Sequence, residues 1–176
     1  TVGSAVRASY ASGGVGTLYS GSASWPSLSP DASRVAYAVS ENNTWRIYVV
    51  PTDGTSGPVF VTNGTYPSWG PNGLIAYQDC PDGQCGLYAI NPDNTADRRR
   101  LTTSAGDLNP QWSPDGNEVV YVTNFTGAWE IFTISMSGQF RQLTSAGGEK
   151  SGPVFSPNGA QIAFALLESL APESRE

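Results

Sequence analysis

The stretch Pro110-Gln111-Trp112-Ser113-Pro114-Asp115-Gly116 is the best guide to the fold, because versions of it recur three more times along the chain. The other copies begin at Pro26, Pro67 and Pro153, so successive copies are spaced by 41, 43 and 43 residues. A repeat period of roughly 20–50 residues is the signature of a repeat architecture. The chain is therefore expected to consist of four related units rather than one irregular domain.

Each copy of this stretch opens a unit made of short apolar strands. In the third unit the strands that follow it cover about 119–121, 129–134 and 141–144. Pro-Asp-Gly favours a tight hairpin turn, since proline fixes φ at the second turn position and glycine accepts a positive φ. The proline two residues before Trp112 removes a backbone donor, which a strand tolerates only at a sheet edge. Each unit is predicted to be a four-stranded antiparallel meander of strands A to D, with A at the edge that lines a central channel.

Composition agrees with an all-β protein and excludes several classes of function. The 176 residues include 20 Gly and 13 Pro, which is typical of short strands joined by tight turns. Histidine is absent, which excludes Ser-His-Asp triads and His-ligated zinc. The net charge of −6 argues against nucleic acid and anionic lipid as partners. We therefore expect no catalytic residues, no cofactor, no metal and, since no apolar run approaches ~20 residues, no membrane span.

The two ends of the chain predict how the units are arranged. The last unit stops after strand B near Leu166, and residues 5–20 match a strand C followed by a strand D when shifted by the 41-residue repeat. The favoured arrangement is a closed β-propeller of four blades, in which strands from residues 5–20 pair with strand B of the last blade. The alternative is a portion of a six- or seven-bladed propeller. The predicted blades, within one domain of residues 1–176, are about 25–64, 65–107, 108–149 and 150–167 plus 5–20.

The repeat resembles that of the TolB-like propellers, which are relatives of the WD-repeat proteins. Leu101-Thr102 precedes the copy at Pro110, and Leu143-Thr144 precedes the copy at Pro153, as the pattern of that family requires. The first unit departs from the pattern with Ala32 at the turn glycine, and the second with Gly70 in place of serine.

The resemblance implies a non-enzymatic subunit or scaffold of the bacterial cell envelope that binds a larger protein complex in the periplasm or outside the cell. Similar propellers in prolyl-oligopeptidase-like enzymes only gate a separate hydrolase domain, so a gating propeller is a further alternative. One scaffold hosts many activities, and the family therefore predicts the fold better than the function.

The candidate partner-binding residues lie in the B–C loops and in the connections between units, because variable loops on a rigid scaffold carry binding residues. Phe125 is the clearest case, a large apolar residue in a loop with no obvious core to fill. Aromatic side chains beside polar ones suit a protein or a glycan surface, so a small-molecule or glycan-binding propeller with Asp107 and Glu149 near the channel mouth stays open. Trp45 and Trp129 are equally compatible with packing between blades. The candidates are Trp25, Tyr66, Asp107, Asn109, Phe125 and Glu149.

Cys80 and Cys85 flank a hairpin tip in the second unit and are predicted to form a cross-strand disulfide. A disulfide indicates an oxidising compartment and hence an extracytoplasmic protein, whereas a reduced pair would fit the cytoplasm.

The segment Asn91-Pro92-Asp93-Asn94-Thr95-Ala96-Asp97 has oxygen ligands at alternate positions, as a calcium loop does. Ala96 stands at the glycine position, no distal Glu follows, and the run of arginines from Arg98 would neutralise the site. A structural turn is favoured over a calcium site.

Overall fold

The structure, a computed structural model, describes residues 5–9, 15–145 and 148–167. It contains three complete four-stranded antiparallel sheets, each a meander of consecutive strands. Blade one is β3 (Ala23–Leu28), β4 (Arg34–Glu41), β5 (Thr44–Pro51) and β6 (Val59–Asn63). Blade two is β7 (Thr65–Trp69), β8 (Ile75–Asp79), β9 (Gly86–Asn91) and β10 (Asn94–Arg100), with a 3₁₀ turn, Pro81–Gly83, at the β8–β9 tip. Blade three is β11 (Leu108–Trp112), β12 (Glu118–Thr123), β13 (Glu130–Ser135) and β14 (Phe140–Gln142).

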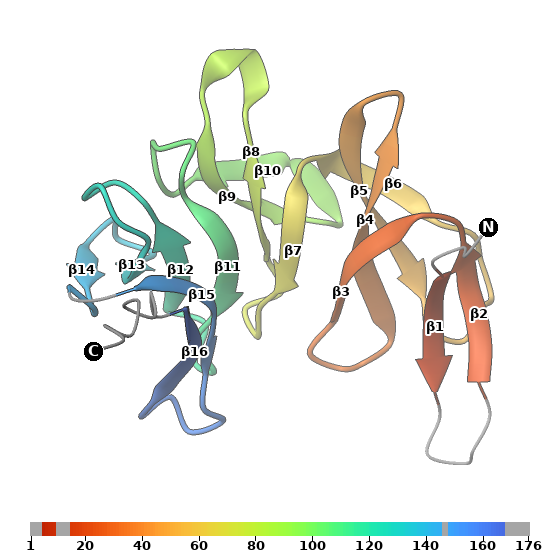
Figure 1. Ribbon diagram of the computed structural model, residues 1–176. Helices are drawn as coiled ribbons and strands as arrows, with labels where there is room; N and C mark the ends of the chain where they lie inside the picture. Colours follow the sequence, from red (N-terminus) through yellow and green to blue (C-terminus); the bar gives the residue numbers. More distant parts are fainter. Residues whose placement is uncertain (1–4, 10–14, 146–147, 168–176) are drawn as a thin grey trace, which may run out of the picture.

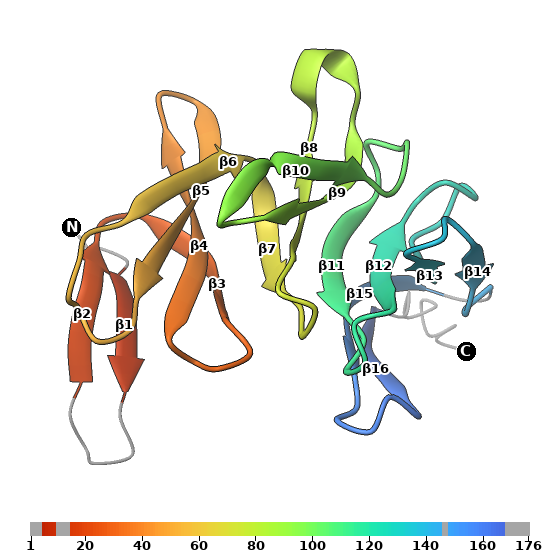
Figure 2. The ribbon, with the colours of Figure 1, turned by 180° about the vertical axis from the view of Figure 1, so that it is seen from behind.

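Two hairpins flank the complete blades. The hairpin of β1 (Ala5–Ser9) and β2 (Val15–Ser20) lies at one end, and that of β15 (Glu149–Phe155) and β16 (Ile162–Leu167) at the other. The first strands of successive units, β3, β7, β11 and β15, lie side by side, as predicted for strands A along a channel. Figures 1 and 2 show the result, an arc of blades with the turns between strands A and B on one face and the tip of the β8–β9 hairpin on the other.

The predicted closure of the ring is wrong. β1 pairs only with β2, and β15 only with β16, within the part of the chain that the structure describes. Figure 1 shows the two hairpins at opposite ends of the arc. Val6 and the partly buried Leu18 and Tyr19 pack against blade one at Val35 and Tyr37, so residues 5–9 and 15–20 occupy the place of a blade that precedes blade one. The described residues are therefore a portion of a propeller, which is the alternative arrangement.

Apolar side chains from facing sheets form the cores between neighbouring blades. Between blades one and two the core contains Ile47, Trp69 and Tyr88, and Trp45 packs against it. Trp129 packs in the same way against the core that Val122 and Ile131 form between blade three and β15–β16. Both tryptophans therefore contribute to inter-blade packing.

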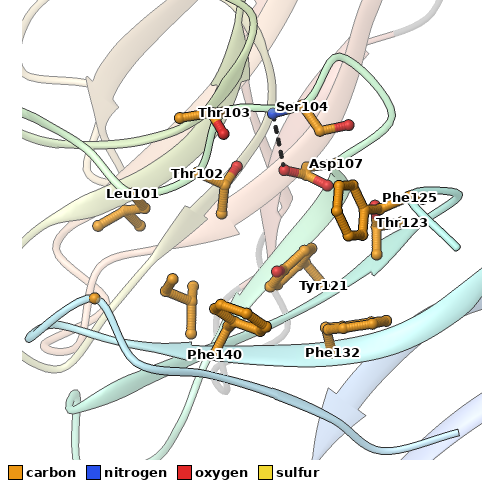
Figure 3. Close-up of a pocket in the computed structure, with 12 residues that line it drawn as sticks. Leu101, Thr102, Thr103, Ser104, Asp107, Tyr121, Thr123, Phe125, Phe132 and Phe140 are labelled. Atoms are coloured by element: carbon orange, nitrogen blue, oxygen red, sulfur yellow. Dashed lines mark hydrogen bonds between the residues drawn. The ribbon is translucent and has the colours of Figure 1, made fainter.

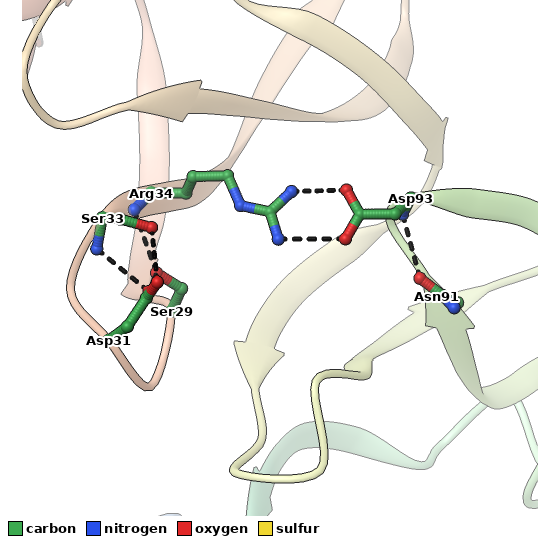
Figure 4. Close-up of polar contacts among 6 residues, drawn as sticks. All are labelled: Ser29, Asp31, Ser33, Arg34, Asn91 and Asp93. Carbon is green, nitrogen blue, oxygen red and sulfur yellow. Dashed lines mark hydrogen bonds and ion pairs between the residues drawn. The ribbon is translucent and has the colours of Figure 1, made fainter.

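The Pro-Asp-Gly turns are closed by a serine that precedes the proline. Ser29 Oγ donates to Asp31 Oδ1 at 2.6 Å and accepts from Arg34 N at 2.9 Å, and hydrogen bonds from Ser29 and then Ser33 lower the pKa of Asp31 to about 2 (Figure 4). Ala32 takes the turn glycine's positive φ, at 56°. Blade two has Gly70 in place of this serine because a Cβ there would lie 2.6 Å from Cγ of Trp112.

The turn that resembled a calcium loop joins two blades instead. Arg34 donates two hydrogen bonds to Asp93, at 2.6 and 3.1 Å, and its guanidinium carbon lies 4.8 Å from the centroid of the Trp69 ring (Figure 4). Asn91 Oδ1 accepts the backbone N–H of Asp93. The carboxylate that would have been a cation ligand is thus paired with an arginine.

Candidate partner-binding site

Each strand A carries a β-bulge at the residue that precedes its proline. The pairing of β3 with β4 shifts between Ser24 and Ser27, and β7, β11 and β15 shift at the same place. The residues at these bulges all have a left-handed backbone: Trp25 (φ 52°), Tyr66 (φ 54°), Asn109 (φ 58°) and Gly152 (φ 58°). Left-handed φ is uncommon for residues other than glycine, particularly bulky aromatic ones, and costs on the order of 1–3 kcal/mol.

The bulges bring three of the predicted residues together. We call Trp25, Tyr66 and Asn109 the bulge row, because they come from successive strands A and line one cavity of about 160 Å³. The ring centroids of Trp25 and Tyr66 lie 4.2 Å apart, and those of Trp25 and Trp45 lie 4.9 Å apart. A bulge re-aims a side chain out of the regular ladder. The local sequence thus creates an aromatic row along the channel side of the arc.

Glu149 lies next to the bulge row. A second cavity, of about 280 Å³, is lined by Tyr66, Asn109 and Glu149 together with Trp129 and Lys150. Glu149 is exposed, whereas Lys150 is buried. This cavity therefore combines half-buried aromatic rings with an exposed carboxylate.

Lys150 and Glu130 form a buried ion pair below this cavity. Lys150 Nζ donates to Glu130 Oε1 at 2.9 Å, the two side chains are 2% and 4% exposed, and Thr144 Oγ1 also donates to Glu130. Burial alone would raise the pKa of Glu130, but the hydrogen bonds from Thr144 and Lys150 and the lysine charge outweigh it and lower the pKa. Sequence reasoning missed this pair, since nothing in the local pattern shows that Lys150 turns inward.

The two remaining candidates, Asp107 and Phe125, lie elsewhere. They line a third cavity, of about 230 Å³, between blades two and three, which we call the inter-blade cavity. Figure 3 shows the Asp107 carboxylate beside the Phe125 ring, with the rings of Tyr121, Phe132 and Phe140 across the cavity. None of the bulge row or Glu149 lines it, so the single predicted face divides into two separate sites.

The inter-blade cavity contains residues that sequence reasoning did not select. Tyr121 and Phe132 are in strands β12 and β13 and read as ordinary core positions, with ring centroids 6.2 Å apart. Phe125 and Phe140 are 76% and 71% exposed. The signal that the sequence offered for this cavity was Phe140, a phenylalanine in the short strand β14.

Cys80 and Cys85 are joined by a disulfide at the tip of the β8–β9 hairpin. Within residues 5–9, 15–145 and 148–167, no group of three or more Cys, Asp or Glu side chains is arranged to hold a metal ion. The same residues contain no helix long and apolar enough to cross a membrane.

An arc of four-stranded antiparallel blades with strands A side by side defines a β-propeller protein. Comparison with known families agrees with this class. The chain belongs to the TolB beta propeller domain family, which matches residues 12–172.

Individual relatives are similar over part of their length. A "Protein TolB homolog" of Chlorobium luteolum is 30% identical over 127 residues, which are 66% of this chain and 27% of the relative. The "Uncharacterized peptidase YuxL" of Bacillus subtilis is 25% identical over 79% of this chain and 28% of its own length. The crystal structure of TolB from Acinetobacter baumannii superposes with a TM-score of 0.79 at 22% identity, over 94% of this chain and 43% of that one. The chain thus spans less than half the length of each of these proteins.

Proposed function

We propose that this chain is part of a non-enzymatic propeller that binds a protein partner through the bulge row at the mouth of the channel. The bulge row carries the proposal. Trp25 and Tyr66 are only half-buried, although they hold a backbone conformation that bulky residues rarely adopt. The left-handed bulge recurs in every unit, so it belongs to the repeat. What distinguishes the first two units is that they place aromatic side chains on it at the cost of backbone strain, where Gly152 adopts the same conformation freely, and such strain is concentrated at ligand-binding positions.

The chemistry of the bulge row suits a protein interface. Tryptophan and tyrosine are the residues most enriched among those that dominate binding energy, and they lose little side-chain entropy on association. The Trp25 ring is already held by Trp45 and Tyr66, so it needs no further ordering when a partner arrives. Asn109 and Glu149 supply hydrogen-bonding groups at the edge of the same surface.

We further propose that the partner belongs to a larger complex of the bacterial envelope and that the chain works in the periplasm or outside the cell. The family to which the chain belongs supports this setting, since the resemblance to TolB-like propellers implies an envelope protein that binds a partner. The Cys80–Cys85 disulfide supports it too, because such bonds persist in oxidising compartments.

Site-specific crosslinking tests the bulge row as the binding surface. A photoreactive phenylalanine derivative replaces Tyr66 in one variant and Asn72, in the turn of blade two on the opposite face, in a matched control. After irradiation in an envelope extract of the encoding organism, the Tyr66 variant is expected to give one dominant adduct that mass spectrometry can identify.

The control decides whether the adduct reports the bulge row. An adduct formed equally from Asn72, or from Asn72 alone, contradicts the proposal. If an adduct forms from Tyr66, Tyr66→Ala should weaken the isolated complex about 10- to 100-fold, as expected for an interface anchor worth about 1–3 kcal/mol.

A second candidate function is that of the propeller part of a peptidase-like protein. The similarity to the Bacillus subtilis relative named as a peptidase favours it. This chain has no histidine, so a histidine general base would have to lie outside its 176 residues. In that case the bulge row would line the route of a peptide substrate, and the Tyr66 adduct would contain peptides of many proteins instead of one partner.

A further inference from the structure

We propose that the inter-blade cavity binds the guanidinium group of an arginine side chain that a basic segment of a partner protein presents. The cavity shares no residue with the bulge row, so this site does not depend on the function proposed above. Two differences between repeat units of the same chain point to this ligand.

The first difference is at the pair of aromatic residues that face each other across strands B and C of a blade. In blade two, Tyr77 and Tyr88 have ring centroids 5.9 Å apart, and the guanidinium of Arg98 lies over them, 5.7 and 4.2 Å from the two centroids. Arg98 also pairs with Asp79 at 3.0 Å. Blade two therefore uses this position to hold an arginine of its own.

Blade three has the same aromatic pair without the arginine. Tyr121 and Phe132 correspond to Tyr77 and Tyr88, and they pair across β12 and β13 as the tyrosines pair across β8 and β9. The register places Phe140 opposite Ile134, where blade two has Arg98 opposite Ile90. The aromatic pair of blade three thus lines an open cavity that lacks an internal cation.

The second difference concerns Asp107, which is 4% exposed. Its carboxylate accepts a hydrogen bond from Ser104 N at 3.3 Å, and no lysine or arginine in the described part of the chain forms an ion pair with it. Burial, followed by the charge of Asp107, raises the pKa of Tyr121, which agrees with the closeness of the two side chains in Figure 3.

The next unit shows what Asp107 lacks. Lys150 stands three residues before Pro153, as Asp107 stands three residues before Pro110, and Lys150 is neutralised by Glu130. In blade two, Gly86 stands at the position of Glu130. The residue after each of them donates its backbone N–H to a threonine hydroxyl: Leu87 donates to Thr102, and Ile131 donates to Thr144.

The backbone excludes a charged partner at Gly86. A Cβ on Gly86 would lie 2.2 Å from Thr102 O, so no side chain can be placed there. A buried carboxylate without a counter-charge is unfavourable. A cation from outside the chain would therefore complete the site.

The geometry selects arginine among cations. A guanidinium is planar, stacks on aromatic rings and donates two parallel hydrogen bonds to one carboxylate, which the Asp107 carboxylate beside four aromatic rings can accept. Hydroxyl groups of Thr103 and Ser104 at the cavity can accept the remaining N–H groups. Volume points to a side chain rather than a whole ligand, because about 230 Å³ is below the ~300–1,000 Å³ of small-molecule sites.

A protein is the source of this arginine because the rim of the cavity is apolar and exposed. Phe125 and Phe140 stand on either side of it and offer contact area for the backbone and neighbours of the inserted residue. The net charge of −6 favours the approach of a basic segment.

Peptide titration followed by amide chemical shifts tests the site. The probe is the blocked peptide Ser-Gly-Arg-Gly-Ser, compared with the same peptide containing citrulline, which keeps the shape of arginine but not its charge, and with free L-arginine. The arginine peptide is expected to shift the amides of Ser104, Thr123 and Phe140 saturably, and to bind at least tenfold more tightly than the citrulline peptide. Free arginine should bind more weakly than the peptide; equal binding would show that the site takes a free guanidinium compound and would overturn the partner segment as its source.

Two variants at the cavity and one control outside it distinguish binding at this site from a general attraction between the acidic protein and the basic peptide. Asp107→Asn should weaken the peptide at least tenfold, while Glu149→Gln, which removes a carboxylate at the channel mouth, should leave binding unchanged. Phe140→Arg, at a position that is 71% exposed, rebuilds the Arg98 contact in blade three and should abolish peptide binding without lowering the melting temperature. Equal binding of both peptides, or unchanged binding in the rebuilt variant, overturns the proposal even if Asp107→Asn fails to fold. Neither a positive nor a negative result of the peptide titration bears on the crosslinking experiment, because Tyr66 does not line the inter-blade cavity.

Discussion

Blades two and three have the same strand order and nearly the same register, yet they treat the same positions differently. Blade two places Arg98 over the aromatic pair of its strands B and C and joins the tip of its B–C hairpin through Cys80 and Cys85. Blade three leaves Phe140 at the position of Arg98 and Phe125 in the corresponding B–C loop, both exposed. One repeat register can therefore hold either an internal contact or an open site, depending on a few side chains.

The junctions between blades show the same contrast in their buried charges. The junction after blade three is neutral, because Lys150 is paired with Glu130. The junction after blade two contains the buried Asp107, and Gly86, which stands where blade three has Glu130, has no side chain to pair with it. Substitutions at these positions test whether the two blades differ in role.

The largest effect is expected from breaking the neutral junction. Lys150→Met leaves Glu130 buried without its counter-charge, and losing one partner of a buried pair lowers the free energy of unfolding by about 3–5 kcal/mol. Urea unfolding measures the loss. The matched control is Arg46→Met, whose pair with Glu41 is 40% and 35% exposed and should contribute about 1 kcal/mol or less. Similar losses in the two variants would mean that the Lys150 pair is no more important than a surface contact.

A smaller effect is expected from the disulfide of blade two. Replacing both cysteines with serine should lower the free energy of unfolding by about 2 kcal/mol, because a loop closed over so few residues restricts the unfolded chain less than a long one does. Intact mass before and after reduction establishes whether native protein contains the bond. The hairpin of blade three needs no such staple, so Phe125→Ser should leave stability nearly unchanged. Free thiols in native protein would contradict the disulfide and remove a main support for an extracytoplasmic location.

The repeat allowed most of the scaffold to be predicted, because turn and strand chemistry are local. The proline before Trp112 predicted an edge strand, and β11 is one. Closure failed for a physical reason: a 41-residue register shows that residues 5–20 resemble strands C and D, but the sheet that such strands join depends on nonlocal packing. Val6 and Leu18 pack on blade one, and this contact places the N-terminal hairpin beside blade one and not beside β15–β16.

The candidate site was predicted only where a local signal existed. Trp25, Tyr66 and Asn109 each precede the proline of strand A, and the structure brings them into one row. Phe125 was recognisable as an apolar loop residue, but its neighbours in space, Tyr121 and Phe132, have the pattern of core positions. Phe140, which also lines this cavity, stands where blade two has Arg98, and this becomes visible only when the strands of the two blades are compared in register.

The smallest effect is expected at this replaced position, and it tests the comparison most directly. Arg98→Met removes a guanidinium from two tyrosine rings and from Asp79, while the methionine keeps much of the apolar contact. Because the Arg98 side chain is 29% exposed, the cation–π and ion-pair contributions together should amount to about 1–2 kcal/mol. Phe140→Met in blade three should change the free energy of unfolding by less than about 0.5 kcal/mol, since the ring is largely exposed and covers no charge. Thermal and urea unfolding of both variants gives the two values. A loss at Phe140 as large as that at Arg98 would show that the phenylalanine is a structural cover like the arginine, and that the two blades differ in composition but not in role.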